Sequence, residues 1–183
     1  MKLRNYSTEA LILAIKDYSE ADRIIVAYTK DFGKLSLIAK GVRKPKSKKR
    51  GHLEIFNHLK FSAVKSKGLD IMIEADLINS FPKIRKNLNK ISVGYYFCEV
   101  IGKSIKEDEK HIALFDFIIE YFSKLEKENN LKSLRMSFIK DLLINLGYWP
   151  KGKDLIDADK VLESVIERNI NSSRVGKRIL EKD

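Results

Sequence analysis

The hydrophobic residues change their spacing near Phe81-Pro82, and this change constrains the fold more than any other feature. Before it, short apolar runs rich in β-branched residues are separated by turns, as in EALILAIKDY at 9–18. From residue 84 onward, apolar residues follow one another at the three-to-four-residue spacing of amphipathic helices. The sequence therefore predicts an α+β chain of two domains, divided between residues 79 and 84.

The first eighty residues contain five candidate strands. Two of them, DRIIVAYTK and LSLIAKGV, flank the turn Asp31 to Lys34, which is the pattern of a β-hairpin. The predicted strands cover residues 9–18, 22–30, 35–42, 52–64 and 69–78. Apolar residues alternate in the last two, with Leu53, Ile55, Leu59, Phe61 and Ala63 in the fourth and Leu69, Ile71, Ile73 and Ala75 on one face of the fifth. Five short strands with glycines at the turns favour a small closed barrel, and we predict a five-stranded OB-fold over residues 1–80.

Residues 81–183 are predicted to form an all-α domain. The predicted helices lie within residues 91–105, 111–128, 133–150 and 157–170, and SSRVGKRILEKD is compatible with a short terminal helix. Gly147 suits the position just after a helix end. Because acids stabilise helix N-termini, Asp108 or Glu109 and Asp157 or Asp159 are expected at two of the starts.

Positive charge is concentrated in one segment. The net charge is +11, yet residues 33–67 contain eleven Lys or Arg and one acid, Glu54, while the rest of the chain is nearly neutral. The stretch KGVRKPKSKKRG at 40–51 alone contains seven basic residues. One intensely basic segment on a neutral body is typical of a polyanion-binding surface. The alternative is a disordered, solvated loop without a specific ligand.

The chain has one cysteine, Cys98, in the apolar run GYYFCEVIG. We expect a buried thiol there, and neither an internal disulfide nor a multi-cysteine zinc site. The sequence contains no run of about eighteen apolar residues and no signal-peptide pattern at its start. A cytoplasmic location is therefore expected.

Several motifs in order resemble the RecO family of bacterial recombination mediators. They are the strand start EADR, the hairpin TKDFGK, then AKG, the basic loop with its serine, GHLEIF, and finally FIKDLLINLGYWP. The resemblance covers roughly residues 1–150 and implies an N-terminal OB-fold and a C-terminal helical domain. It implies binding of single- and double-stranded DNA, annealing of complementary strands, and help in loading RecA. The implied protein partners are RecR and the acidic tail of single-stranded-DNA-binding protein.

The sequence departs from this family in two respects. Many members carry a four-cysteine zinc site after the Leu-Gly-Tyr-x-Pro element, whereas KGKDLIDADK follows here, so no zinc or other cofactor is expected. The chain is also shorter than typical members, which leaves open whether tail binding is retained.

The candidate DNA-binding residues are Lys34, Lys40, Arg43, Lys44, Lys46, Lys48, Lys49 and Arg50. Lys60, Lys65 and Lys67 are candidates to extend this positive track. OB-folds also use aromatic stacking platforms, and the candidates are Tyr28, Phe32, Phe56 and Phe61. Aromatic residues at strand spacing are more often core, and Phe32 in the turn is expected to be the most exposed of the four.

Arg135 and Lys140 precede Leu-Gly-Tyr-x-Pro and are candidates for binding the acidic tail; a plain solvated helix surface is the alternative. Tyr148 and Trp149 line the same region or cap the core. The histidines 52, 58 and 111 lack metal-ligand spacing, and no nucleotide-binding or nucleophile motif is present. We therefore expect a protein without enzymatic activity. An RNA-binding OB protein and a phosphate-handling enzyme are the alternatives.

Overall fold

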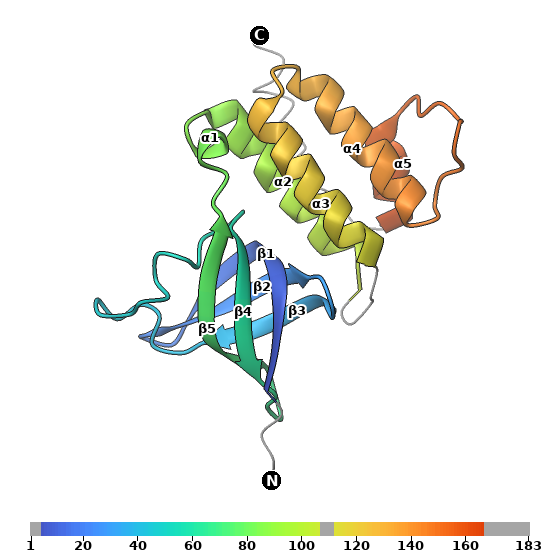
Figure 1. Cartoon of the computed structure of the whole chain (residues 1–183). Helices are drawn as coiled ribbons and strands as arrows, with labels where there is room; N and C mark the ends of the chain where they lie inside the picture. The colour runs from blue at the N-terminus through green and yellow to red at the C-terminus, as the bar shows by residue number, and fades with distance from the viewer. Residues whose placement is uncertain (1–4, 107–111, 167–183) are drawn as a thin grey trace. The chain divides into compact units, whose positions relative to one another are not determined.

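The computed structural model describes residues 5–106 and 112–166, in which five strands are followed by five helices (Figure 1). The strands are β1 (Asn5–Tyr18), β2 (Asp22–Thr29), β3 (Gly33–Ala39), β4 (His58–Val64) and β5 (Asp70–Asn79). The helices are α1 (Pro82–Arg85), α2 (Leu88–Ser104), α3 (Ile112–Lys127), α4 (Leu131–Asn145) and α5 (Ala158–Ile166). Two compact units result: one contains the strands and the described residues of 105–119, and the other contains residues 81–104 and those after 119.

The five strands close into a barrel in the order β1-β2-β3-β5-β4. The first half of β1 pairs antiparallel with β4 and its second half with β2, so this long strand belongs to both sides of the barrel. β3 and β5 pair in parallel, through Leu37 with Asp70 and Ile38 with Ile71. The barrel confirms the predicted OB-fold, and the helices after it confirm the predicted α+β class.

Apolar side chains from every strand fill the barrel. Ile12, Ile25, Leu37 and Leu59 are fully buried, and Met72 is 1% exposed. Burying a side chain of this size contributes about 1.5–3 kcal/mol, so these positions hold the barrel together.

The segment predicted to begin the fourth strand is a loop. β4 starts at His58, and residues 52–57 form turns and irregular chain. Leu53 is nevertheless fully buried and Phe56 is 2% exposed. Phe56 has a φ of 76°, which no β-strand contains. The alternation of Leu53 and Ile55 therefore reflects a loop that closes over the barrel.

A register shift interrupts the alternation predicted for β5. The pairing of β5 with β4 skips from Met72 to Glu74 and leaves Ile73 without a partner residue. Ile73 is 43% exposed, whereas Met72 and Ala75 are buried. The β-bulge separates Ile73 from the buried Ala75, with which the predicted alternation placed it on one face.

The helical unit has an aromatic core. Phe97 of α2 stacks on Phe138 of α4 with ring centroids 3.9 Å apart. Tyr121 and Phe122 of α3 approach Phe97 edge-on at 6.2 and 6.0 Å. All four rings are at most 3% exposed, so the predicted apolar faces join these helices.

Two helix ends agree with the sequence prediction. α4 ends at Asn145, and Gly147 follows with a φ of 78°, the left-handed conformation expected just beyond a helix. At the start of α5, Asp157 Oδ1 accepts a hydrogen bond from the Lys160 amide at 3.3 Å. The carboxylate thus satisfies an N–H group that has no partner inside the helix.

The predicted start at Asp108 or Glu109, the last residues of the predicted helix 157–170 and the terminal helix lie outside the described residues. The predicted division after residue 80 stays a prediction. Within the described part of the chain, no helix has the length and apolar character needed to cross a membrane.

Candidate nucleic-acid interface

The basic stretch lies on the connection between β3 and β4, residues 40–57, which we call the basic loop. It is the teal connection that leaves the barrel beside β5 (Figure 1). Its first part is a series of turns: the amides of Lys44, Ser47 and Arg50 donate to the carbonyls three residues earlier, at 3.2, 3.0 and 3.3 Å. Local hydrogen bonds therefore give this part of the loop a regular series of turns.

Both ends of the basic loop are fixed to the barrel. Val42 near its start and Leu53 near its end are fully buried in the barrel core. The Phe56 amide donates to the Ile12 carbonyl, and the Ile12 amide donates to the Asn57 carbonyl, each at 3.0 Å. These contacts fix both ends of the loop to the barrel.

Six of the eight candidate DNA-binding residues are exposed on this loop. We call them the six loop cations: Lys40, Arg43, Lys44, Lys46, Lys48 and Arg50. Arg43 lies 3.7 Å from Asp17 and donates to the Ser19 carbonyl at 3.2 Å. The other five make no ion pair with a described residue. Their exposed positive charge has no ion-pair partner in the part of the chain that the structure describes.

Lys34 and Lys49 differ from the six loop cations because each is partly buried. Lys34 donates to the Ile105 carbonyl, and Lys49 Nζ donates to the Met72 carbonyl at 2.9 Å. Burial lowers the pKa of the Lys49 ammonium, and Asp22 opposes that shift. Both ammonium groups already bond to the protein, a distinction that the sequence did not reveal.

The candidate stacking residues are mostly core. Tyr28, Phe61 and Phe56 are 0%, 1% and 2% exposed, so these three rings do not reach a base in this structure. Phe32 is half-buried in the β2–β3 turn, and its ring packs edge-on against Tyr6 at 4.8 Å. The preference for core is thereby confirmed for three of the four.

The candidates for extending the positive track lie on β4 and the β4–β5 turn. Lys60, Lys65 and Lys67 are all exposed. Lys65 is 3.7 Å from Asp70, and its ammonium lies 5.4 Å from the centroid of the Tyr6 ring. This second group is therefore less positive than the basic loop.

The candidate tail-binding residues occupy different environments. Arg135 is 7% exposed; its guanidinium pairs with Asp159 and lies 4.3 Å from the centroid of the Tyr96 ring. The expectation of a surface charge at Arg135 is thus wrong, because Asp159, which follows 24 residues later, draws it into the helical unit. Lys140 is half-buried and lies 3.7 Å from the exposed Asp154.

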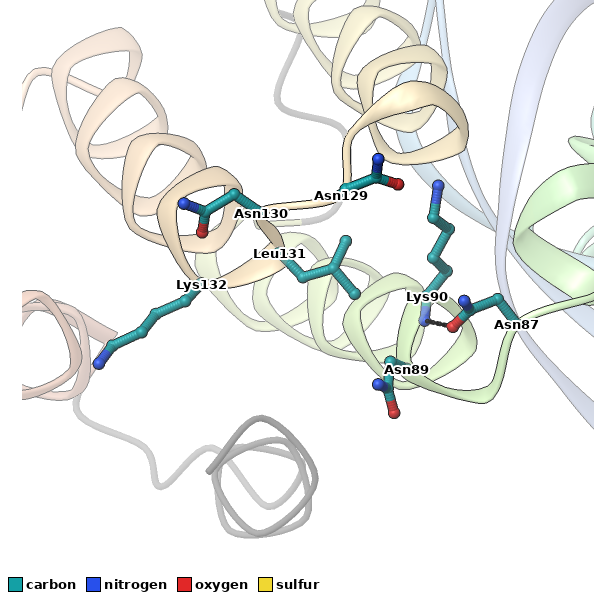
Figure 2. Close-up of a pocket in the computed structure, with 7 residues that line it drawn as sticks. All are labelled: Asn87, Asn89, Lys90, Asn129, Asn130, Leu131 and Lys132. Carbon is teal, nitrogen blue, oxygen red and sulfur yellow. Dashed lines mark hydrogen bonds between the residues drawn. The ribbon is translucent and has the colours of Figure 1, made fainter. Parts of the chain in front are cut away.

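The helical unit also contains a polar pocket of about 250 Å³, which the sequence did not predict. Its lining residues are Asn87, Asn89, Lys90, Asn129, Asn130, Leu131 and Lys132. Figure 2 shows the hydrogen bond from the Lys90 amide to Asn87 Oδ1, 3.1 Å long. Lys90 Nζ donates to the Glu126 carbonyl at 2.8 Å, so this ammonium caps the end of α3. The lining contains amides, one leucine and two lysines, and no carboxylate, histidine, hydroxyl or thiol side chain.

The two histidines that the structure describes are engaged in polar contacts, and the one cysteine is buried. His52 Nδ1 lies 2.6 Å from the Ala75 carbonyl, and His58 Nε2 lies 3.1 Å from Glu9. Burial raises the pKa of the Cys98 thiol, which disfavours a reactive thiolate. Among the described residues, no group of three His, Cys, Asp or Glu could hold a metal ion.

The fold and the loop together define a class of protein: an OB-fold barrel with an ordered cationic loop, followed by a helical unit. Residues 1–81 match the family "Recombination protein O N terminal", and residues 85–154 match "Recombination protein O C terminal". The chain belongs to the RecO family.

Individual relatives agree with this assignment. "DNA repair protein RecO" of Dehalococcoides mccartyi is 30% identical over 165 residues, which cover 90% of this chain and 65% of the relative. The proteins of the same name from Clostridium novyi and Geobacter sulfurreducens are 32% and 33% identical, covering 78% and 76% of this chain. The chain spans 56% and 58% of those two proteins. It therefore corresponds to somewhat less than two thirds of these relatives.

Proposed function

We propose that the protein is a DNA-repair and recombination mediator that binds DNA through the six loop cations. Such a protein would bind single- and double-stranded DNA, anneal complementary strands, and help load RecA onto DNA coated by single-stranded-DNA-binding protein. The observation that carries the proposal is the ordered basic loop: its cations are exposed, while Val42 and Leu53 at its ends are buried in an OB-fold barrel.

The physical mechanism is neutralisation of phosphate charge. Each phosphate contact releases condensed counterions, so affinity is expected to fall steeply with salt. Phosphate contacts carry no base information, so little sequence preference is expected. Since the contacts come from the backbone side, the base edges stay free to pair. A protein that lowers the repulsion between two strands in this way promotes their annealing.

The helical unit is proposed to bind protein partners. Lys140 is the remaining surface candidate for the acidic tail of single-stranded-DNA-binding protein, and RecR is a second proposed partner. RecA is involved indirectly, through the DNA. We propose a non-catalytic role without a cofactor, in the cytoplasm and near the nucleoid.

An annealing assay tests this function. Complementary oligonucleotides, bare or coated with single-stranded-DNA-binding protein, are mixed with the wild-type protein and with a loop variant, in which the six loop cations are changed to Gln. A helix variant provides the matched control, because it removes six exposed lysines from the helical unit: Lys83, Lys86, Lys127, Lys132, Lys151 and Lys153, all changed to Gln.

The proposal predicts fast annealing by the wild-type protein and the helix variant, and annealing near the spontaneous rate with the loop variant. Equal annealing by the loop variant and the wild type would refute the DNA-binding role of the basic loop. Preference for RNA over DNA of equal length would favour the RNA-binding alternative.

A further inference from the structure

The barrel has an incomplete edge where β3 ends. β3 and β5 share only two residue pairs, the last of them Ile38 with Ile71. β3 stops at Ala39, whereas β5 continues to Asn79. In the described structure, β5 therefore runs beyond its parallel neighbour, and main-chain groups on that side need other partners, since unpaired edge groups are costly when shielded from water.

Two side chains of the basic loop reach carbonyl groups of this part of β5. Lys49 Nζ donates to the Met72 carbonyl at 2.9 Å, and His52 Nδ1 lies 2.6 Å from the Ala75 carbonyl. Because a carbonyl oxygen only accepts, Nδ1 of His52 must carry the proton. The two bonds lie at the end of the cationic run, just before the buried anchor Leu53.

Main-chain bonds transmit this attachment to the rest of the loop. The amides of His52 and Leu53 both donate to the Lys49 carbonyl, at 3.1 and 3.2 Å. The Asn57 side chain donates to the His52 carbonyl at 2.8 Å. Lys49 and His52 thus belong to one hydrogen-bonded turn that joins the basic loop to β5.

We propose that Lys49 and His52 are positioning residues that fasten the basic loop to the open edge of β5, so that its exposed cations meet a DNA strand in a fixed arrangement. The inference rests on the proposed DNA binding, and it removes Lys49 from the residues that touch phosphate. It assigns adjacent lysines different tasks: Lys48 contacts DNA, and Lys49 holds the loop.

The salt dependence of DNA affinity separates these two tasks. Lys49→Gln and Lys48→Gln remove the same charge at neighbouring positions. Loss of one phosphate contact lowers the slope of log affinity against log salt by about 0.7 on a single strand. Loss of a positioning bond lowers the fraction of protein with a docked loop, which weakens affinity equally at all salt concentrations.

The experiment measures fluorescence-anisotropy titrations of a single-stranded oligonucleotide across a salt series, together with hydrogen exchange of peptides covering residues 44–53 in the free protein. We expect Lys49→Gln to bind about 3- to 10-fold more weakly with an unchanged slope, and to exchange faster in the loop. We expect Lys48→Gln to lower the slope by about 0.7 and to leave exchange unchanged.

Conservative variants provide the rescue arm. Lys49→Arg keeps a cationic donor and should restore wild-type affinity. His52→Asn keeps a short N–H donor and should retain affinity, whereas His52→Leu should resemble Lys49→Gln in both measurements. The melting temperature of each variant confirms that the barrel is folded.

Each outcome decides the proposal. Equal losses of slope in Lys49→Gln and Lys48→Gln, with unchanged loop exchange, would make Lys49 an ordinary phosphate contact and overturn the positioning role alone. A wild-type protein that binds no DNA would overturn the proposed function and this inference with it, whatever the exchange data show.

Discussion

At the scale of single residues, the most informative contact joins Arg135 and Asp159. Their side chains are 8% and 18% exposed, and the Tyr96 hydroxyl donates to the same carboxylate at 3.2 Å. The neighbouring sequence predicts that Arg135 lies on a helix surface and that Asp159 lies near a helix start. It gives no sign that the two side chains meet. The partner that decides their role is remote in sequence, so this buried cluster could not be predicted from local pattern.

Removing one member of this cluster should destabilise the protein. Asp159→Ala leaves the Arg135 guanidinium buried without its counter-charge, which typically costs about 3–5 kcal/mol of unfolding free energy. Asp154→Ala is the control, because Asp154 is 99% exposed and its removal should leave stability essentially unchanged. Denaturant unfolding measures both, and equal stability of the two variants would contradict the structural role of the pair.

His58 should give the barrel a pH-dependent stability. Burial, more than any other cause, lowers its pKa below the ordinary 6.5, although Glu9 opposes the shift. As the pH falls below about 6.5, the unfolded chain binds this proton before the folded chain does, so the free energy of unfolding decreases. His58→Gln should flatten the dependence between pH 7 and the lower folded-state pKa, as measured by urea unfolding. An unchanged pH profile would count against this assignment.

Among the helices and strands, the sequence predicted those features that depend on residue spacing or on the backbone preference of a single residue. The barrel strands, the change to helices near Pro82 and the stop at Gly147 each follow from spacing or from one backbone preference. The predicted start of β4 was wrong because Leu53 is buried by a loop that closes over the barrel, and its spacing from Ile55 is the same as in a strand. The predicted face of Ile73 was wrong because the sequence of β5 alone does not show the β-bulge in its pairing with β4.

Alanine substitution should have opposite effects on stability at two glycines, one just beyond a helix and one inside a helix. Gly147 has a φ of 78°, so Gly147→Ala should cost about 1 kcal/mol through backbone strain, with no neighbouring atom in the way. Gly102 lies inside α2 with open space around it, so Gly102→Ala should stabilise by about 0.5–1 kcal/mol. Thermal unfolding of both variants provides the measurement, and the same sign for both would contradict this reasoning.

At the scale of the whole molecule, charge is divided between the basic segment and a nearly neutral remainder. The sequence was sufficient to locate this segment, because charge needs no fold to be counted. It was not sufficient to sort the cations: only the structure distinguishes exposed Lys48 from Lys49, which bonds to Met72. That distinction depends on β5, which the chain reaches some twenty residues later.

If the six loop cations bind DNA, the affinity of the protein for a single strand must fall steeply with salt. Anisotropy titrations of the wild-type protein should give a slope of about −4 for log affinity against log salt, since each of the six contacts contributes about −0.7. The helix variant should keep that slope, and the loop variant should lose most of the slope and the affinity. A loop variant with wild-type slope and affinity would show that these six cations do not bind the DNA.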